Sequence, residues 1–194
     1  MGRVSLGLAG LALVVACGGG GGGGSIHVNT DYDPLASPKM SAYKTWNWLR
    51  PPAGTAGRAD SSVQGIVEQA IEARLVSLGY HLTDTSPEFK VGWHAALEGP
   101  IDVTAANSYY GYAWGKWFPG GGVAYSRGFH SEFEPGSLVV DITDSKASEL
   151  IWRGTGREVF GGKKASGNRV ADAVAKMFLQ IPCLLYTSPS PRDS

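Results

Sequence analysis

The chain lacks several features that would point directly to a class of function. Of its 194 residues only two are cysteines, Cys17 and Cys183, so a framework of several disulfides is excluded. Its 17 basic and 17 acidic residues cancel, which excludes the strongly basic character typical of nucleic-acid binding. No Gly-x-Ser-x-Gly sequence occurs, so the nucleophile elbow of common esterases is also excluded.

A long hydrophobic run is missing too, although a short one is present at the N-terminus. It covers residues 4–16 and follows a single basic residue, Arg3, whereas a membrane-spanning helix needs about 20 apolar residues. A basic start before a short apolar run is typical of a secretory signal peptide. The small and branched residues before Cys17 resemble a bacterial lipobox, in which the cysteine becomes the lipid-carrying N-terminus. We therefore predict a lipoprotein signal peptide over residues 1–16; the alternative is an ordinary signal peptide with Cys17 incidental.

Seven glycines and Ser25 follow this cysteine. Such a stretch cannot bury apolar surface and behaves as a flexible coil with an end-to-end distance of roughly 15 Å. We therefore predict a lipidated tether over residues 17–25, whose fatty acyl chains, palmitate among them, anchor the protein in a membrane. Gly18 stands where an aspartate would favour retention in the inner membrane. By similarity to sorted lipoproteins, the expected location is the periplasmic face of the outer membrane.

The apolar pattern after the tether predicts a single domain over residues 26–182. One amphipathic helix is expected over residues 61–78, with Gly79 ending it. A second is expected from about Asn168, and its inner face carries Val170, Val174, Met177, Phe178 and Ile181. Strands are predicted at residues 42–49, 80–84, 88–97, 136–144 and 149–160, the last two forming an antiparallel hairpin. These elements predict an α+β fold: a mostly antiparallel sheet of about five strands with two amphipathic helices packed on one face.

Five stretches of this domain are similar to successive motifs of one bacterial family. The similarity lies in VNTDYDPLASPKMSAYKTWNW, IVEQAIEARLVSLGYHL, SPEFKVGWHA, GSLVVDITDSKASELIWRGTG and VADAVAKMFLQIP, between Val28 and Pro182. The chain thereby resembles the lipoproteins that carry the domain of unknown function 4136. The resemblance implies an exported, anchored α+β domain of the bacterial envelope. It implies no reaction and supplies no catalytic residues.

Few residues have the spacing of a metal or catalytic site. His27, Asp31 and Asp33 lie close together in HVNTDYD, but no Gly-centred calcium loop surrounds them. We expect solvated polar positions where a strand begins, and we predict neither a metal nor another cofactor. The other histidines lie far apart without a His-x-x-x-His spacing: His81, His94 and His130.

Asp141 and Arg153 lie on the two strands of the predicted hairpin. With a turn of five residues, both side chains lie on the outer face of the hairpin and can meet. With a turn of four residues they point to opposite faces, because a shift of one residue in the register moves a side chain to the other face of the sheet. An exposed cross-strand ion pair contributes less than about 1 kcal/mol. We predict a structural role for the pair rather than a catalytic one.

Residues 107–133 concentrate aromatic side chains among glycines, in the stretch NSYYGYAWGKWFPGGGVAYSRGFHSEF. Tyr and Trp rings offer flat, amphipathic surfaces that suit sugars, peptides or a bilayer interface. The alternative is a hairpin whose rings merely cover one edge of the sheet. Connections longer than about 15 residues are mostly functional or disordered. The predicted ligand-binding residues are Tyr109, Tyr110, Tyr112, Trp114, Trp117 and Phe118.

These observations predict a monomeric lipoprotein of the outer membrane that acts as a binding or envelope-assembly module with a protein partner. The alternative is a glycan-binding module for peptidoglycan. A hydrolase needs a nucleophile, a base and an oxyanion site, which the sequence does not supply, so we do not expect an enzyme. A convergence of Ser, His and Asp side chains in one cleft would change that expectation.

The last residues, 183–194, differ from the rest. The stretch CLLYTSPSPRDS has no periodicity, and the family similarity stops at Pro182, where a second proline is expected. A back-translation of residues 183–193 resembles a transposase-end sequencing adapter. We therefore predict that this tail is translated adapter sequence and that Cys183 has no redox or metal role.

Overall fold

The computed structural model describes residues 25–32, 37–50, 61–97, 99–102, 113–114, 132–161 and 166–181. These residues form three helices and nine strands. The helices are α1 (Ser37–Ala42), α2 (Ser61–Ser77) and α4 (Gly167–Phe178). The strands are β1 (His27–Tyr32), β2 (Thr45–Trp48), β3 (His81–Leu82), β4 (Phe89–Ala95), β5 (Ile101–Asp102), β6 (Ala113–Trp114), β7 (Glu132–Phe133), β8 (Leu138–Asp144) and β9 (Glu149–Arg157).

Seven of the strands form one sheet in the order β1-β9-β8-β4-β2-β3, with β6 paired to β9 beside this path. The pairs β1–β9, β9–β8 and β8–β4 are antiparallel. Strand β2 is parallel to both β3 and β4, and β6 is parallel to β9. The predicted α+β fold is confirmed, but the expectation of a mostly antiparallel sheet is wrong, because the sheet is mixed.

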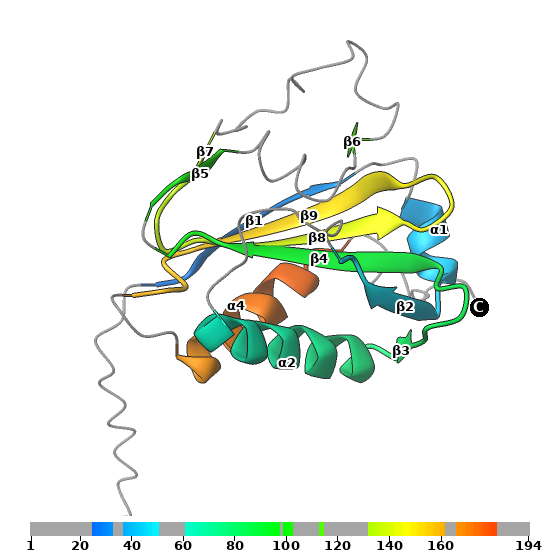
Figure 1. The fold of residues 1–194 in the computed structure, drawn as a ribbon, viewed down its shortest axis with the longest axis horizontal. Coiled ribbons are helices and arrows are strands. Elements are labelled where there is room, and N and C mark those ends of the chain that lie inside the picture. Colours follow the sequence, from blue (N-terminus) through cyan, green and yellow to red (C-terminus); the bar gives the residue numbers. More distant parts are fainter. Residues whose placement is uncertain are drawn as a thin grey trace, which may run out of the picture.

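The parallel part of the sheet follows from the position of α2 in the chain. A strand can return parallel to its predecessor only through a long crossover connection, which is commonly a helix. Helix α2 lies between β2 and β3 along the chain, so β3 joins the sheet parallel to β2. The small β5–β7 sheet lies on the side of the large sheet opposite α2 and α4 (Figure 1).

Helices α2 and α4 pack side by side against one face of the sheet (Figure 1). On α2 the buried side chains recur every four residues, at Val63, Val67, Ile71 and Leu75, as the sequence predicts. Gly79 ends the helix with a φ of 85°, in the left-handed region that glycine adopts without steric cost. Within the described part of the chain, neither these helices nor α1 is long and apolar enough to span a membrane.

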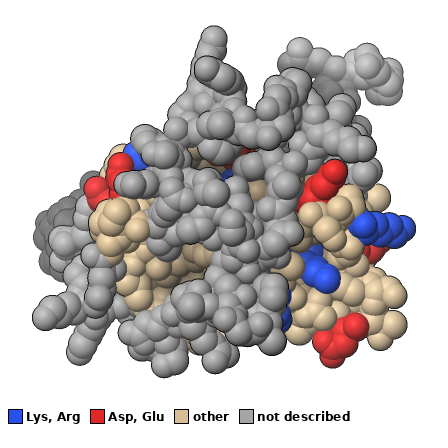
Figure 2. All heavy atoms as spheres, turned by 45° about the horizontal axis from the view of Figure 1, so that its top comes forward, with Lys and Arg blue, Asp and Glu red and all other residues tan. Residues whose placement is uncertain are grey.

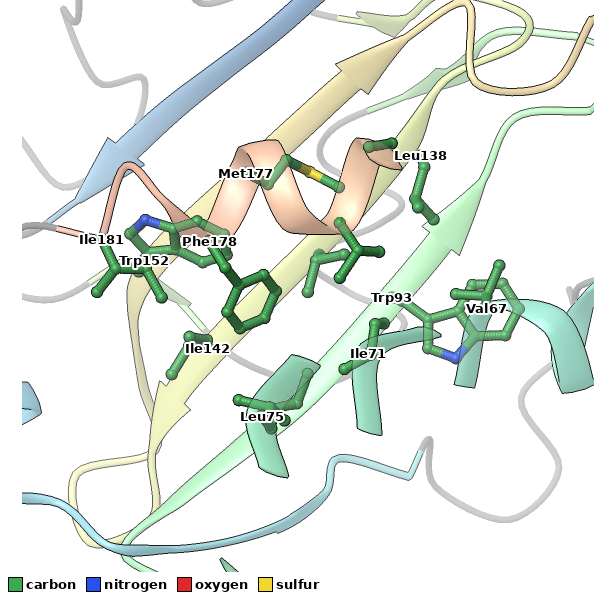
Figure 3. Packing of buried hydrophobic residues seen from close by; sticks show 14 of the residues in the cluster. Val67, Ile71, Leu75, Trp93, Leu138, Ile142, Trp152, Met177, Phe178 and Ile181 are labelled. Atoms are coloured by element: carbon green, nitrogen blue, oxygen red, sulfur yellow. The ribbon is translucent and has the colours of Figure 1, made fainter. Parts of the chain in front are cut away.

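The hydrophobic core fills the space between these helices and the sheet (Figure 3). The five residues predicted on the inner face are all buried, four of them on α4 and Ile181 just after its end. Strands β4 and β8 contribute alternate side chains to the same core, as the period of two in a strand requires. Strand β9 contributes two adjacent residues, Ile151 and Trp152, where its pairing with β8 shifts register. The sheet residues at the centre are Val91, Trp93, Leu138, Val140, Ile142 and Trp152.

Two glycines on β9 allow α4 to approach the sheet closely. A Cβ on Gly154 would lie 2.5 Å from Cη2 of Trp152 and 3.0 Å from Sδ of Met177. A Cβ on Gly156 would lie 2.9 Å from Cγ2 of Val159. The missing side chains leave room for the Trp152 ring, which packs against Phe178 with 5.3 Å between ring centroids.

Candidate binding face of the sheet

The face of the sheet opposite the helices carries a row of charged residues across three strands. Leu138, Val140 and Ile142 of β8 point into the core, so Asp141 points to the other face. Arg153 of β9 is its direct cross-strand neighbour, and Asp31 of β1 lies opposite Arg153. Asp141, Arg153 and Asp31 therefore follow one another across neighbouring strands.

A β-bulge brings Asp141 and Arg153 together. Four residues, 145–148, separate β8 from β9, and a regular pairing from this turn would place Asp141 opposite Trp152. The register shifts between Ile142 and Thr143, and the extra residue on β9 restores Arg153 as the partner. Asp141 and Arg153 therefore meet on the outer face, which was one of the two alternatives predicted from the sequence. The turn has four residues and not five, and the β-bulge provides the one-residue shift in register that a five-residue turn would have provided.

The Asp141–Arg153 ion pair is buried. Arg153 Nε donates to Oδ1 of Asp141 at 2.6 Å, and Nη2 donates to Oδ2 at 2.8 Å. The exposed fraction of the side chain is 2% for Arg153 and 0% for Asp141. The contribution of less than about 1 kcal/mol expected for an exposed ion pair therefore does not apply to this pair. Burial costs several kcal/mol per ion in lost hydration, which two parallel charged hydrogen bonds offset.

His94 lies on the same face, on β4. It is opposite Val139 and diagonal to Asp141. Burial lowers the pKa of His94 to about 4; the Asp141 carboxylate acts in the opposite direction, and Arg153 lowers it further. The imidazole is therefore neutral at neutral pH.

Ser137 directly precedes β8, and its carbonyl oxygen accepts from the N–H of Ala96. Continuing the β4–β8 register by one residue makes Ser137 the other diagonal neighbour of His94, so a serine, a histidine and an aspartate share this face. Sequence spacing gave no sign of this arrangement, because the three residues come from two strands with unrelated spacing. Ser137 is 1% exposed, and its Oγ makes no hydrogen bond within the described part of the chain. Both carboxylate oxygens of Asp141 accept from Arg153. The hydrogen-bonded Ser–His relay of a serine hydrolase is therefore not formed.

Asp31 is half-buried, whereas a solvated position was expected from the sequence. Burial raises the pKa of its carboxyl, and the charge of Arg153 opposes this. His27 is exposed, with 3.2 Å between its Nε2 and Oγ of Ser25, and Asp33 lies outside the described residues. Across the described ranges, no three His, Cys, Asp or Glu side chains are grouped as metal ligands.

The aromatic segment meets this face at its last residue, Phe133. Its side chain is buried, and its ring lies 5.4 Å from Cζ of Arg153. This distance is within the range of a cation–π interaction. Phe133 pairs with Ile101 in the β5–β7 sheet, while Trp114 pairs through its backbone with Leu150 of β9. Cys17, His130 and residues 183–194 lie outside the described ranges. So do the other predicted ligand-binding residues, which are Tyr109, Tyr110, Tyr112, Trp117 and Phe118.

On the face shown in Figure 2, the described residues form neither an acidic nor a basic patch, because acidic and basic side chains are interspersed. This agrees with the equal numbers of basic and acidic residues in the sequence. In the described part of the chain, the distinctive electrostatic feature is instead the buried pair of Asp141 and Arg153.

The model of the family described as "Domain of unknown function (DUF4136)" matches residues 28–183. The comparison with curated proteins found no match in sequence. Among solved structures, a PDZ domain protein from Parabacteroides distasonis is similar at 13% identity and a TM-score of 0.45, over 84% of this chain. This chain spans only 37% of that protein. The PelC dodecamer from Paraburkholderia phytofirmans is similar at 11% identity and a TM-score of 0.39, over 81% of this chain and 97% of that one.

Proposed function

The chain belongs to the DUF4136 family of domains of unknown function, and on this premise we propose that it is an outer-membrane lipoprotein that acts as a binding or assembly module of the cell envelope. Cys17 carries the lipid in this proposal, because it follows a basic residue and a short apolar run. The glycine tether then holds the domain at the periplasmic face of the membrane. The resemblance to envelope lipoproteins supports the same location.

The binding role is carried by one observation, the Phe133 ring over the buried Asp141–Arg153 pair. A buried ion pair seldom stabilises a fold more than apolar side chains of the same size would. Its rigid, bidentate geometry can instead fix the position of the ring that contacts it. Phe133 ends the aromatic segment, so the pair fixes the point at which this segment leaves the sheet.

Proteins are proposed as partners because aromatic side chains are enriched at the energetic centres of protein interfaces. Peptidoglycan is the alternative ligand, since the amphipathic faces of Tyr and Trp also suit sugar rings. A hydrolase is the weakest of the three proposals. Ser137 has no hydrogen bond to a base within the described residues, and Arg153 engages both oxygens of Asp141.

The test replaces Trp114 and Trp117 with Ala in the full chain. Binding should fall because two aromatic rings of the segment are lost, while the free energy of unfolding should change by less than about 1 kcal/mol, because the proposal assigns neither ring to the core. A photo-crosslinking residue at position 118 in intact cells reports a protein partner, and co-sedimentation with purified peptidoglycan reports a glycan. Leu179→Ala is the matched control, because Leu179 is an apolar residue with 59% exposure at the end of the helix layer.

A protein crosslink that the two substitutions abolish supports the assembly module. Co-sedimentation that they abolish supports the glycan module instead. If both readouts match those of Leu179→Ala, or if unfolding becomes easier by several kcal/mol, the tryptophans are not a binding surface.

A further inference from the structure

Strand β1 forms an edge of the large sheet. It pairs with β9 through all six of its residues, and no other described strand pairs with it. Proteins usually block such edges with proline, lysine or a bulge, because unpaired N–H and C=O groups invite another strand. Within β1 there is no proline, lysine or register shift. The edge is therefore regular enough to accept a further strand.

We propose that this edge pairs with β1 of a second copy of the chain, antiparallel and about a two-fold axis at Asn29. Main-chain hydrogen bonds would then join the two sheets into one, as in other cases of strand addition. Such an interface is isologous, because the same surface is used twice. The proposal replaces the monomer expected from the sequence and does not depend on the proposed binding function.

The side chains of β1 select this register. His27, Asn29 and Asp31 share the outer face, and Val28, Thr30 and Tyr32 share the helix face. Pairing about Asn29 places His27 opposite the partner's Asp31, so that an imidazole meets a carboxylate twice in each dimer. On the helix face it places Tyr32 opposite the partner's Ile26. Cross-strand pairs of this kind are what stabilises one register over another.

The charged row on the outer face continues across this junction. In one copy, Asp31 has Arg153 opposite it on β9, and no described strand pairs with it on its other side. The second copy would supply the partner's His27 there, with the partner's Arg157 next in line. Asp31 is half-buried, and burial raises the pKa of its carboxyl, so a second donor or cation beside it is favourable.

The competing same-face register pairs the strands about Thr30. It aligns Asn29 with the partner's Asp31, and it moves the residue opposite His27 to the partner's Asp33, which lies beyond the end of β1 and outside the described residues. It also pairs only residues 28–32 of each strand, whereas the register about Asn29 includes Ile26 and His27 as well. The two registers differ by one residue at the axis, so they can be distinguished directly.

Cysteine crosslinking makes this distinction. In the full chain with Cys17→Ser and Cys183→Ser, Asn29→Cys places two thiols at the axis, where directly opposite Cα atoms lie about 4.5–5.5 Å apart. This separation suits a disulfide. Thr30→Cys is the matched control, because its Cα atoms are then diagonal and about 7–8 Å apart. We expect covalent dimers with diamide for Asn29→Cys and at least about tenfold fewer for Thr30→Cys.

Charge substitution at the axis tests the same contact without a crosslink. Asn29→Asp places two carboxylates opposite each other, and like charges in this position are destabilising. We expect dimerisation of the Asn29→Asp chain to weaken about tenfold and that of Asn29→Ser to change less than about twofold, measured by light scattering. Mixing the Asn29→Asp chain with the Asn29→Lys chain should restore dimers.

Efficient crosslinking at Asn29 with rescue in the mixed sample establishes the interface. Preferential crosslinking at Thr30 overturns the register. A wild-type chain that stays monomeric at all concentrations, with no Asn29→Cys dimers, overturns the proposal. Dimers that Asn29→Asp leaves unchanged also overturn it, because they must form through another surface.

Discussion

Acidification should destabilise the protein through His94. The pKa of this buried imidazole is about 4, against an ordinary value of 6.5, so the unfolded chain takes up the proton at a higher pH than the folded one. The stability that neutral His94 contributes is therefore complete above pH 6.5 and is lost as the pH falls toward 4. At pH 5 these two pKa values correspond to a loss of about 2 kcal/mol, and the limit near pH 4 is about 3 kcal/mol.

Two carboxyl groups with shifted pKa values also make stability depend on pH, and they act in opposite directions. Burial raises the pKa of Asp31 above its ordinary value of 3.8, so its contribution decreases as the pH rises through its folded pKa and opposes the His94 effect. The backbone N–H groups of Lys44 and Thr45 lower the pKa of Glu88 below its ordinary value of 4.5, so its contribution is lost only below that pH. A His94→Gln variant retains both groups and therefore isolates the histidine.

The measurement is urea unfolding of the wild type and His94→Gln, followed by tryptophan fluorescence between about pH 7.5 and pH 5. We expect the wild type to lose about 2 kcal/mol more than the variant across this range. His27 and His81 are exposed and are present in both chains, so their effects cancel. Parallel stability curves for the two chains would refute the argument, because His94 would then titrate alike in the folded and unfolded states.

Three further predictions concern the buried ion pair, the glycines and the proposed lipid anchor. Arg153→Met leaves the Asp141 carboxylate buried without its counter-ion, so we expect a loss of about 3–5 kcal/mol in urea unfolding, and Asp141→Leu in the same chain should restore most of it; strictly additive losses would contradict the pairing. Gly154→Ala places a methyl group 2.5 Å from the Trp152 ring and should cost about 1–3 kcal/mol or more, whereas Gly65→Ala in α2, with nothing within 4 Å, should stabilise by about 0.5–1 kcal/mol. Cys17→Ala should release the full chain from membranes, since stable anchoring takes more than one acyl chain; a variant that still floats with membranes after a high-salt wash would contradict the lipoprotein proposal.

Local patterns in the sequence were sufficient for the helices and the hairpin. The apolar stripe of α2 and its end at Gly79 depend on residues close in the chain, and both were predicted correctly. The same holds for α4, whose inner face is buried as expected. These features follow from the helical period and from the φ that glycine tolerates.

Non-local features were beyond those patterns. Strand β1 is rich in polar residues, because its outer face carries the charged row, so it gave only a weak strand signal. The β-bulge between Ile142 and Thr143 depends on how β8 and β9 pair, and no residue of the turn indicates that their register shifts. The contact of the Phe133 ring with Arg153 depends on the separate β5–β7 pairing, in which Phe133 lies opposite Ile101, and no local pattern predicts that pairing.

The pairing of β1 with β9 constrains the order in which the protein can fold. These strands lie near opposite ends of the chain and are separated by well over a hundred residues. Strand β9 also stands between β1 and β8, so without it β1 has no place in the sheet. Contacts of such long sequence separation form late and slow the folding of a chain. A chain that crosses a membrane with its N-terminus first would therefore keep β1 unpaired until β9 has followed, and it would complete its sheet only after nearly the whole domain has been delivered.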